Sequence, residues 1–112
     1  MDAILDYISL QMEYAQKYGV DITTQIYKAQ LTEGTEFFLG RDRALPAGLT
    51  GILSHLQAQN VIRTEKSADE ISNEILVIAR GILYNWCQSK GSYDLQLFAR
   101  TLVENYIKAY LC

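Results

Sequence analysis

Proline, cysteine and histidine are all scarce in this chain of 112 residues, and each shortage excludes a class of protein. The single proline, Pro46, excludes collagen-like and proline-rich linker proteins. The two cysteines, Cys87 in a helical pattern and Cys112 as the last residue, form neither a zinc motif nor a disulfide framework. We therefore expect two free thiols in a reducing cytoplasm. The one histidine, His55, has no catalytic partners marked by spacing, so nothing supports a Ser-His-Asp arrangement.

Long apolar runs and clusters of positive charge are also missing. The longest unbroken apolar runs are short, such as residues 75–79, so no segment is expected to span a bilayer. Residues 1–7 lack the basic and apolar regions of a signal peptide. Ten Lys and Arg oppose thirteen Asp and Glu, and the cations are scattered, with Arg41 and Arg43 as the nearest pair. Without a basic stripe, this chain is not expected to contact nucleic acid directly.

Residues for catalysis or metal binding do not occur at useful spacings. No run of Asp, Glu, His or Cys has the spacing of metal ligands, and no glycine-rich phosphate loop is present. Glu70 and Glu74 share a helix face, but Glu70 is needed for a helix cap. We therefore expect no enzymatic activity, no metal and no cofactor.

Five stretches carry helical periodicity and strand patterns are nearly absent, so the predicted fold class is all-α, with five helices in one domain over residues 1–112. The helices are predicted over about residues 3–18, 21–32, 45–59, 68–90 and 93–111. Gly19 and Gly91 are predicted stops. Ser67 and Glu70 form a capping box before the fourth helix. The narrow apolar stripe of the second helix consists of Ile22, Ile26 and Ala29.

The last two predicted helices have wider apolar faces than a five-helix domain can cover. Each is apolar over about half of its circumference, whereas about 100° is enough for one buried face. We predict that these helices pack against those of a second chain as a four-helix bundle about a twofold axis. A thick monomeric core is the alternative. The predicted homodimer interface consists of Val77, Gly81, Tyr84, Phe98, Leu102, Val103, Tyr106 and Tyr110.

Aromatic residues are abundant, with eight Tyr, three Phe and one Trp. Tyrosine suits a binding pocket because it combines a flat apolar ring with one hydrogen-bonding group. We predict a cavity for a neutral or cationic molecule that is aromatic or amphipathic. Ordinary core and interface packing is the alternative. The predicted lining residues are Tyr7, Tyr14, Tyr18, Phe37, Phe38, Leu53, Leu83 and Trp86.

Three segments in the second half of the chain form a recognisable pattern. They are Arg-Gly-Ile-Leu-Tyr-Asn-Trp at 80–86, Gly-Ser-Tyr-Asp-Leu at 91–95, and a final helix that ends in Tyr-Ile-Lys-Ala-Tyr-Leu at 106–111. In this pattern the second half of the chain resembles the end of a TetR-family transcriptional regulator. The earlier part is similar in pattern, with two helices, a loop and a proline-started helix that ends in Gln-Ala-Gln-Asn at 57–60.

This resemblance implies an effector-binding and dimerisation domain of a repressor. In that family the last two helices form the dimer, the preceding helices enclose a small-molecule pocket, and effector binding releases DNA. The family's helix-turn-helix domain has no counterpart in this sequence. Two explanations stay open, a truncated piece of a regulator or a natural relative without that domain. Two other functions also stay open: a helical dimerisation or scaffold module without a ligand, and a small helical enzyme that would need a polar cleft around His55.

Overall fold

The computed structural model describes residues 2–33 and 44–112, and these ranges form five α-helices and one 3₁₀ helix. The elements are α1 (Asp2–Tyr18), α2 (Val20–Glu33), α4 (Ala44–Ala58), α5 (Ala68–Gln88), α6 (Leu95–Ile107) and η2 (Lys108–Tyr110). The all-helical prediction is therefore confirmed for this part of the chain. Every helix in these ranges is too short or too polar to cross a membrane.

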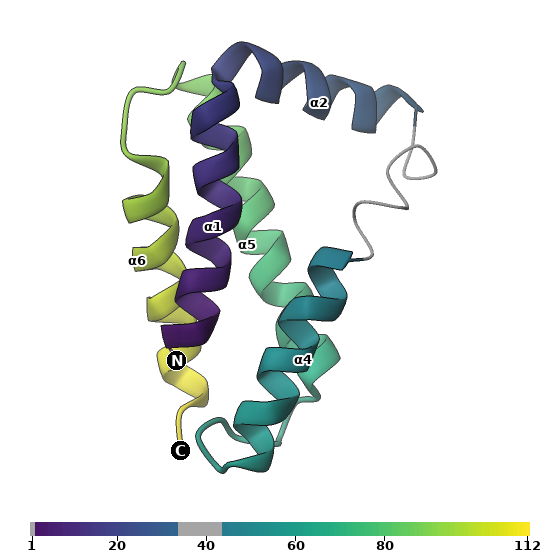
Figure 1. Ribbon diagram of the computed structural model, residues 1–112, viewed down its shortest axis with the longest axis vertical. Coiled ribbons are helices and arrows are strands. Elements are labelled where there is room, and N and C mark those ends of the chain that lie inside the picture. The colour runs from purple at the N-terminus through teal and green to yellow at the C-terminus, as the bar shows by residue number, and fades with distance from the viewer. Residues whose placement is uncertain (1, 34–43) are drawn as a thin grey trace.

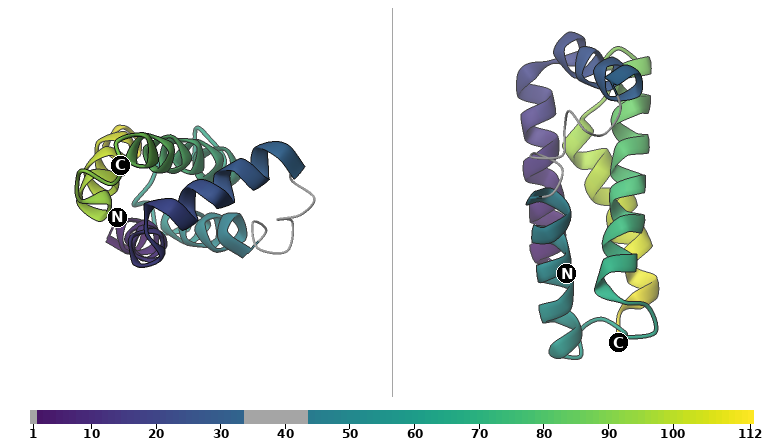
Figure 2. Two further views of the ribbon diagram at one scale, coloured as in Figure 1. Left: turned by 90° about the horizontal axis from the view of Figure 1, so that it is seen from above. Right: turned by 90° about the vertical axis from the view of Figure 1, so that its right-hand side faces the viewer.

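Four of the helices lie in two layers, with α1 and α4 in one and α5 and α6 in the other (Figure 2). The helix α2 crosses the layers at one end and packs on α1 and α5 (Figure 1). At the opposite end, α1 begins and α6 ends (Figure 1). The result is a flat domain with extents of 41 × 31 × 18 Å. Each layer therefore has one inner side, which meets the other layer, and one outer side.

The core lies between the two layers. In α1 the buried side chains are Ile4, Leu5, Ile8 and Met12, which recur at the three- and four-residue spacing of one helix face. Each of the other long helices contributes a similar stripe to the same cluster. These stripes consist of Leu49 and Leu53 from α4; Ile71, Ile75, Leu76, Ala79, Ile82 and Trp86 from α5; and Leu95, Ala99, Val103 and Ile107 from α6.

Two glycines end helices, as the sequence predicts. Gly19 has φ +90° and separates α1 from α2, and Gly91 has φ +73° in the turn between α5 and α6. This left-handed region is open to glycine at little cost because glycine has no Cβ. The helix α5 ends at Gln88, two residues before its predicted end, and the amide of Gly91 donates to the carbonyl oxygen of Trp86 at 2.9 Å.

The helix α6 is shorter than the predicted range 93–111. It begins at Leu95 because the side chain of Asp94 caps it by accepting from the amide of Leu97 at 3.3 Å. It ends at Ile107, where the chain tightens into η2 and then becomes extended at Leu111. Leu111 forms an isolated antiparallel bridge with Ile62, a contact between distant parts of the sequence that local periodicity does not encode.

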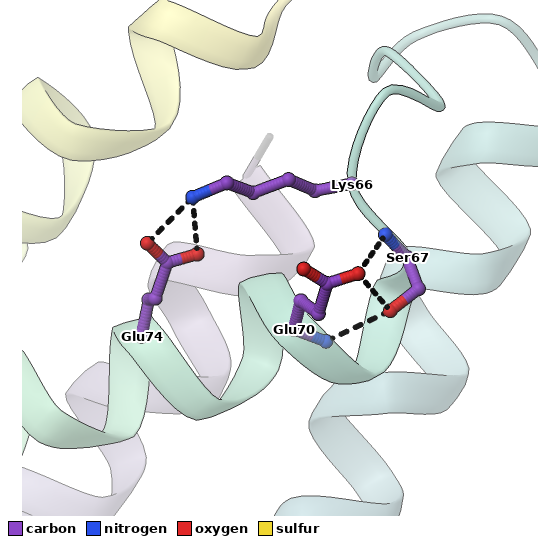
Figure 3. A network of polar contacts seen from close by, with 4 residues as sticks. All are labelled: Lys66, Ser67, Glu70 and Glu74. Carbon is purple, nitrogen blue, oxygen red and sulfur yellow. Dashed lines mark hydrogen bonds and ion pairs between the residues drawn. The ribbon is translucent and has the colours of Figure 1, made fainter.

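The capping box before α5 is present, as predicted. The hydroxyl of Ser67 accepts from the amide of Glu70 at 3.1 Å, and the carboxylate of Glu70 accepts from the amide of Ser67 at 3.3 Å (Figure 3). These bonds satisfy two backbone groups that the first turn of a helix otherwise leaves open. The start of α5 is thus fixed by two neighbouring side chains.

Ser67→Ala is expected to lower the free energy of unfolding by about 1 kcal/mol, because it removes the acceptor of this cap. Ser67→Thr is the matched control, since it keeps a hydroxyl at the same position. Urea unfolding followed by circular dichroism measures both variants. A change within experimental error for Ser67→Ala would contradict a stabilising role for the cap.

Candidate functional site

The outer side of α5 and α6 carries several exposed apolar residues, which together we call the outer α5–α6 face. Its members project away from the core, and four of them are large side chains with high exposure: Val77 (57%), Tyr84 (53%), Leu97 (63%) and Phe98 (40%). The fifth member, Gly81, is also exposed. Large apolar groups gathered on one face of a small domain commonly mark a surface that binds a partner.

Tyr93 links the two helices beneath this face. Its hydroxyl donates to Oδ1 of Asn85 at 2.9 Å and lies 3.3 Å from the carbonyl oxygen of Ile82. Its ring meets that of Phe98 edge to face, with centroids 4.9 Å apart. Such an aromatic pair is a favourable and directional contact. Phe98 is therefore held on a ring that is itself hydrogen-bonded to the last two turns of α5.

Gly81 has open space beside it. A Cβ built at this position would meet no atom of the described residues within 4 Å. Glycine in the interior of a helix costs about 1 kcal/mol relative to alanine, so this residue lowers the stability of α5. A glycine at an exposed position, next to Val77 and Tyr84, would allow another helix to approach closely.

The predicted interface residues divide into three groups by burial. Val77, Gly81, Tyr84 and Phe98 are exposed on the outer α5–α6 face. Leu102, Tyr106 and Tyr110 are half-buried. Val103 differs from the prediction, because it is fully buried in the chain's own core at 0% exposure. It belongs to the buried stripe of α6 and offers no exposed surface to a second chain. Leu97, which the prediction omitted, is the most exposed apolar side chain of the face.

The predicted pocket residues of α4 and α5 lie in the core or against it. Leu53 and Trp86 are buried in the core, and Leu83 is half-buried against it. The indole nitrogen of Trp86 donates to the carbonyl oxygen of Tyr93 at 3.1 Å, so this ring has a structural role. Phe37 and Phe38 lie outside the described residues.

The three predicted tyrosines of α1 have different surroundings. Tyr7 is half-buried against Gly48 of α4, where a Cβ on Gly48 would collide with its hydroxyl, and this burial raises the pKa of Tyr7. Tyr14 and Tyr18 are 51% and 56% exposed. They belong to a row of exposed apolar residues at four-residue spacing in the sequence, which includes Ile22 and Ile26 of the predicted stripe of α2. The row consists of Leu10, Tyr14, Tyr18, Ile22 and Ile26.

A shallow depression of about 170 Å³ lies along this part of α1. Its lining is Leu10, Glu13, Tyr14 and Lys17, which combine an apolar group, a ring and both signs of charge. Pockets that bury a drug-sized ligand have volumes of about 300–1,000 Å³. The depression is therefore large enough for part of a small molecule and too small to enclose one.

A polar cluster lies at the end of the domain where α5 begins. Lys66 Nζ contacts the carboxylate of Glu74 at 2.8 and 3.0 Å (Figure 3) and lies 5.5 Å from the ring centroid of Tyr110. The hydrogen bond to Glu74 raises the pKa of Lys66 to about 12, and Lys66 lowers the pKa of Glu74. Burial raises the pKa of Tyr106, whose ring is 5.3 Å from that of Tyr110. An amine held in its protonated form is a poor nucleophile or base, so the cluster is suited to joining chain segments.

Across residues 2–33 and 44–112, no three His, Cys, Asp or Glu side chains gather as metal ligands would. His55 is exposed on α4. In comparisons with protein-family models, with curated proteins and with solved structures, the chain has no significant match.

Proposed function

We propose that this chain is the effector-binding and dimerisation domain of a TetR-like transcriptional repressor, and that two copies associate through the outer α5–α6 face. The observation that carries the proposal is the exposed glycine at position 81 beside the exposed side chains of Val77 and Tyr84. A glycine that weakens its own helix, with open space beside it among the described residues, is accounted for if a second helix packs there.

The proposed assembly is a four-helix bundle made of α5 and α6 from each copy. A twofold contact brings the same surface of both copies together, so one self-complementary face is enough for the assembly. Val77, Tyr84 and Phe98 supply the large apolar groups that such an interface buries. The aromatic pair of Tyr93 and Phe98 supports a preorganised surface, since it restricts the Phe98 ring before association.

The proposed effector is a neutral or cationic molecule that is aromatic or amphipathic. Support comes from the row of exposed apolar residues along α1 and α2, in which Tyr14 and Tyr18 offer rings and hydroxyl groups. Bound effector would favour one domain geometry over another and so release DNA. In this proposal the DNA is bound by a separate helix-turn-helix domain, and this chain itself has no cofactor, no catalytic role and no direct contact with nucleic acid.

A dimerisation or scaffold module without a ligand is the second candidate. It is favoured by the burial of Leu53 and Trp86, which belong to the hydrophobic core of the chain. It shares the dimer with the first candidate and differs from it only in effector binding.

Native mass spectrometry of the purified chain, compared with a denaturing spectrum, tests the proposal. We expect a dimer that carries a small molecule released on denaturation. A monomer at micromolar concentration would overturn the proposed interface. A dimer that binds no member of a panel of aromatic and amphipathic cations would reject the sensor and favour the module without a ligand.

A further inference from the structure

The five residues after α6, residues 108–112, lie across the turn that joins α4 to α5. We call these residues the strap and residues 59–67 the α4–α5 turn. The amide of Arg63 donates to the carbonyl oxygen of Tyr110 at 2.7 Å, and the amide of Cys112 donates to that of Val61 at 3.0 Å. These two bonds flank the antiparallel bridge between Ile62 and Leu111. Segments about fifty positions apart in the sequence are thus paired through their backbones.

Side chains add to this pairing on the α5 side. Lys66 reaches from the turn over the ring of Tyr110 and forms an ion pair with Glu74 of α5. The ring of Tyr110 also stacks obliquely on that of Tyr106 in α6. A cation beside an aromatic face is attracted to it, so Lys66 holds the strap and α5 at the same time.

The same turn is fastened to α4. Nε2 of Gln57 in α4 donates to the carbonyl oxygens of Arg63 and Lys66 at 2.9 and 2.8 Å. The amide of Val61 donates to the carbonyl oxygen of Leu56 at 2.9 Å. The strap is therefore joined, through the turn, to the end of α4, which belongs to the other layer (Figure 2).

The strap itself is weakly anchored compared with its surroundings. None of the residues of η2 is buried, Cys112 is exposed, and Leu111 is half-buried. In contrast, Ile107 before the strap and Ile62 beneath it are almost fully buried. Segments with few buried apolar contacts and few hydrogen bonds open locally at a lower free energy than the whole domain unfolds.

We propose that the strap is a conformational clasp that holds the α4–α5 turn and the end of α4 on α6, and that opens without unfolding of α1, α5 and α6. When closed, it transmits displacements between α4 and the end of α6. When open, it frees the turn and the last part of α4 from the α5–α6 layer. The clasp stands on contacts within one chain and does not depend on the proposed function.

Hydrogen exchange measured by mass spectrometry tests the clasp in a chain that lacks residues 110–112. We expect amides of residues 59–66 to exchange about tenfold faster, because two backbone hydrogen bonds worth about 0.5–1.5 kcal/mol each are lost. Exchange in α1 and the central part of α5 should stay at the level of the intact chain. The matched control is Cys112→Ala, which keeps the backbone amide that donates to Val61 and should leave exchange unchanged.

Two results would overturn the clasp. Unchanged exchange in residues 59–66 would show that the strap does not hold the turn, and a uniform increase across all helices would show that it belongs to the global folding unit. Gln57→Met tests the link to α4, since it removes the two side-chain hydrogen bonds that Gln57 donates to the turn. We expect faster exchange in residues 53–58 with the strap still paired. Unchanged exchange there would overturn transmission through Gln57.

Discussion

Gly81→Leu is expected to convert the proposed dimer into folded monomers. A leucine side chain at this exposed position on α5 has free space in the single chain but would occupy the volume that a second helix needs. Overpacking costs about 1–3 kcal/mol at each site, and twofold symmetry places the change in both copies, so the dissociation constant should rise about 100-fold or more. Sedimentation velocity over a range of protein concentrations measures this shift.

Gly51→Leu is the matched control for this variant. Gly51 is also an exposed glycine inside a helix, and a Cβ there would likewise meet no atom within 4 Å, but it lies on α4. Leucine should strengthen the helix at both positions by less than about 1 kcal/mol, so both variants should stay folded. Only the change at Gly81 should weaken association. Equal dissociation constants for the two variants would reject the outer α5–α6 face as the interface.

Phe98→Glu provides a second test of the same face. It places a charge at an exposed position that a dimer would bury, and a buried unpaired charge is strongly unfavourable. Val103→Glu cannot serve this purpose, because Val103 is in the core and a carboxylate there would unfold the chain. A dimer that persists in Phe98→Glu with unchanged affinity would place the interface elsewhere.

Gly91→Ala is expected to lower the free energy of unfolding by about 2–4 kcal/mol, for two reasons. An alanine in the left-handed conformation costs about 1–2 kcal/mol. The added Cβ would also collide with a neighbouring side chain. Gly91 has φ +73°, and an added Cβ would lie 2.6 Å from Cγ2 of Val20. It would also approach the ring of Trp86 at 3.5 Å. The loss would be a large part of the stability of a small domain. Urea unfolding followed by circular dichroism measures it.

Gly19→Ala separates the two causes. Gly19 has φ +90°, but a Cβ there would meet nothing within 4 Å, so only the backbone cost of about 1–2 kcal/mol should appear. Adding Val20→Ala to Gly91→Ala should recover part of the loss, because it removes the atom with which the Cβ collides. Equal effects for Gly19→Ala and Gly91→Ala, with no recovery in the double variant, would refute the collision.

Sequence reasoning predicted those parts of the fold that depend on neighbouring residues. The capping box of Ser67 and Glu70, the stop at Gly19 and the buried stripe of α1 all follow from local patterns and are present. The end of α6 at Ile107 was not predictable in this way. It depends on the bridge between Ile62 and Leu111, and apolar residues continue beyond it with a helical spacing.

The candidate site was harder to predict. A helical pattern gives the direction in which each side chain projects from the helix axis, but it does not show which other helix packs there. Tyr7 and Tyr14 lie on the same flank of α1, yet Gly48 of α4 packs only on Tyr7, and Tyr14 stays exposed. Val103 was placed within a wide apolar arc of α6, and only the position of the α1–α4 layer shows that it faces inward. The outward position of Val77 was clear because it lies opposite the main stripe of α5.

The environment of Trp86 gives the protein a built-in optical reporter. The chain has one tryptophan, so its fluorescence has a single source. The indole ring is 5% exposed near Gly91 and Val20, and its N–H is bonded to the carbonyl oxygen of Tyr93. Water that reaches the indole near Gly91 and Val20 would shift the fluorescence emission to longer wavelength. The emission of Trp86 would therefore report looser packing around the indole in Gly91→Ala. The separation of two intact copies at Gly81 would leave the indole in its apolar surroundings.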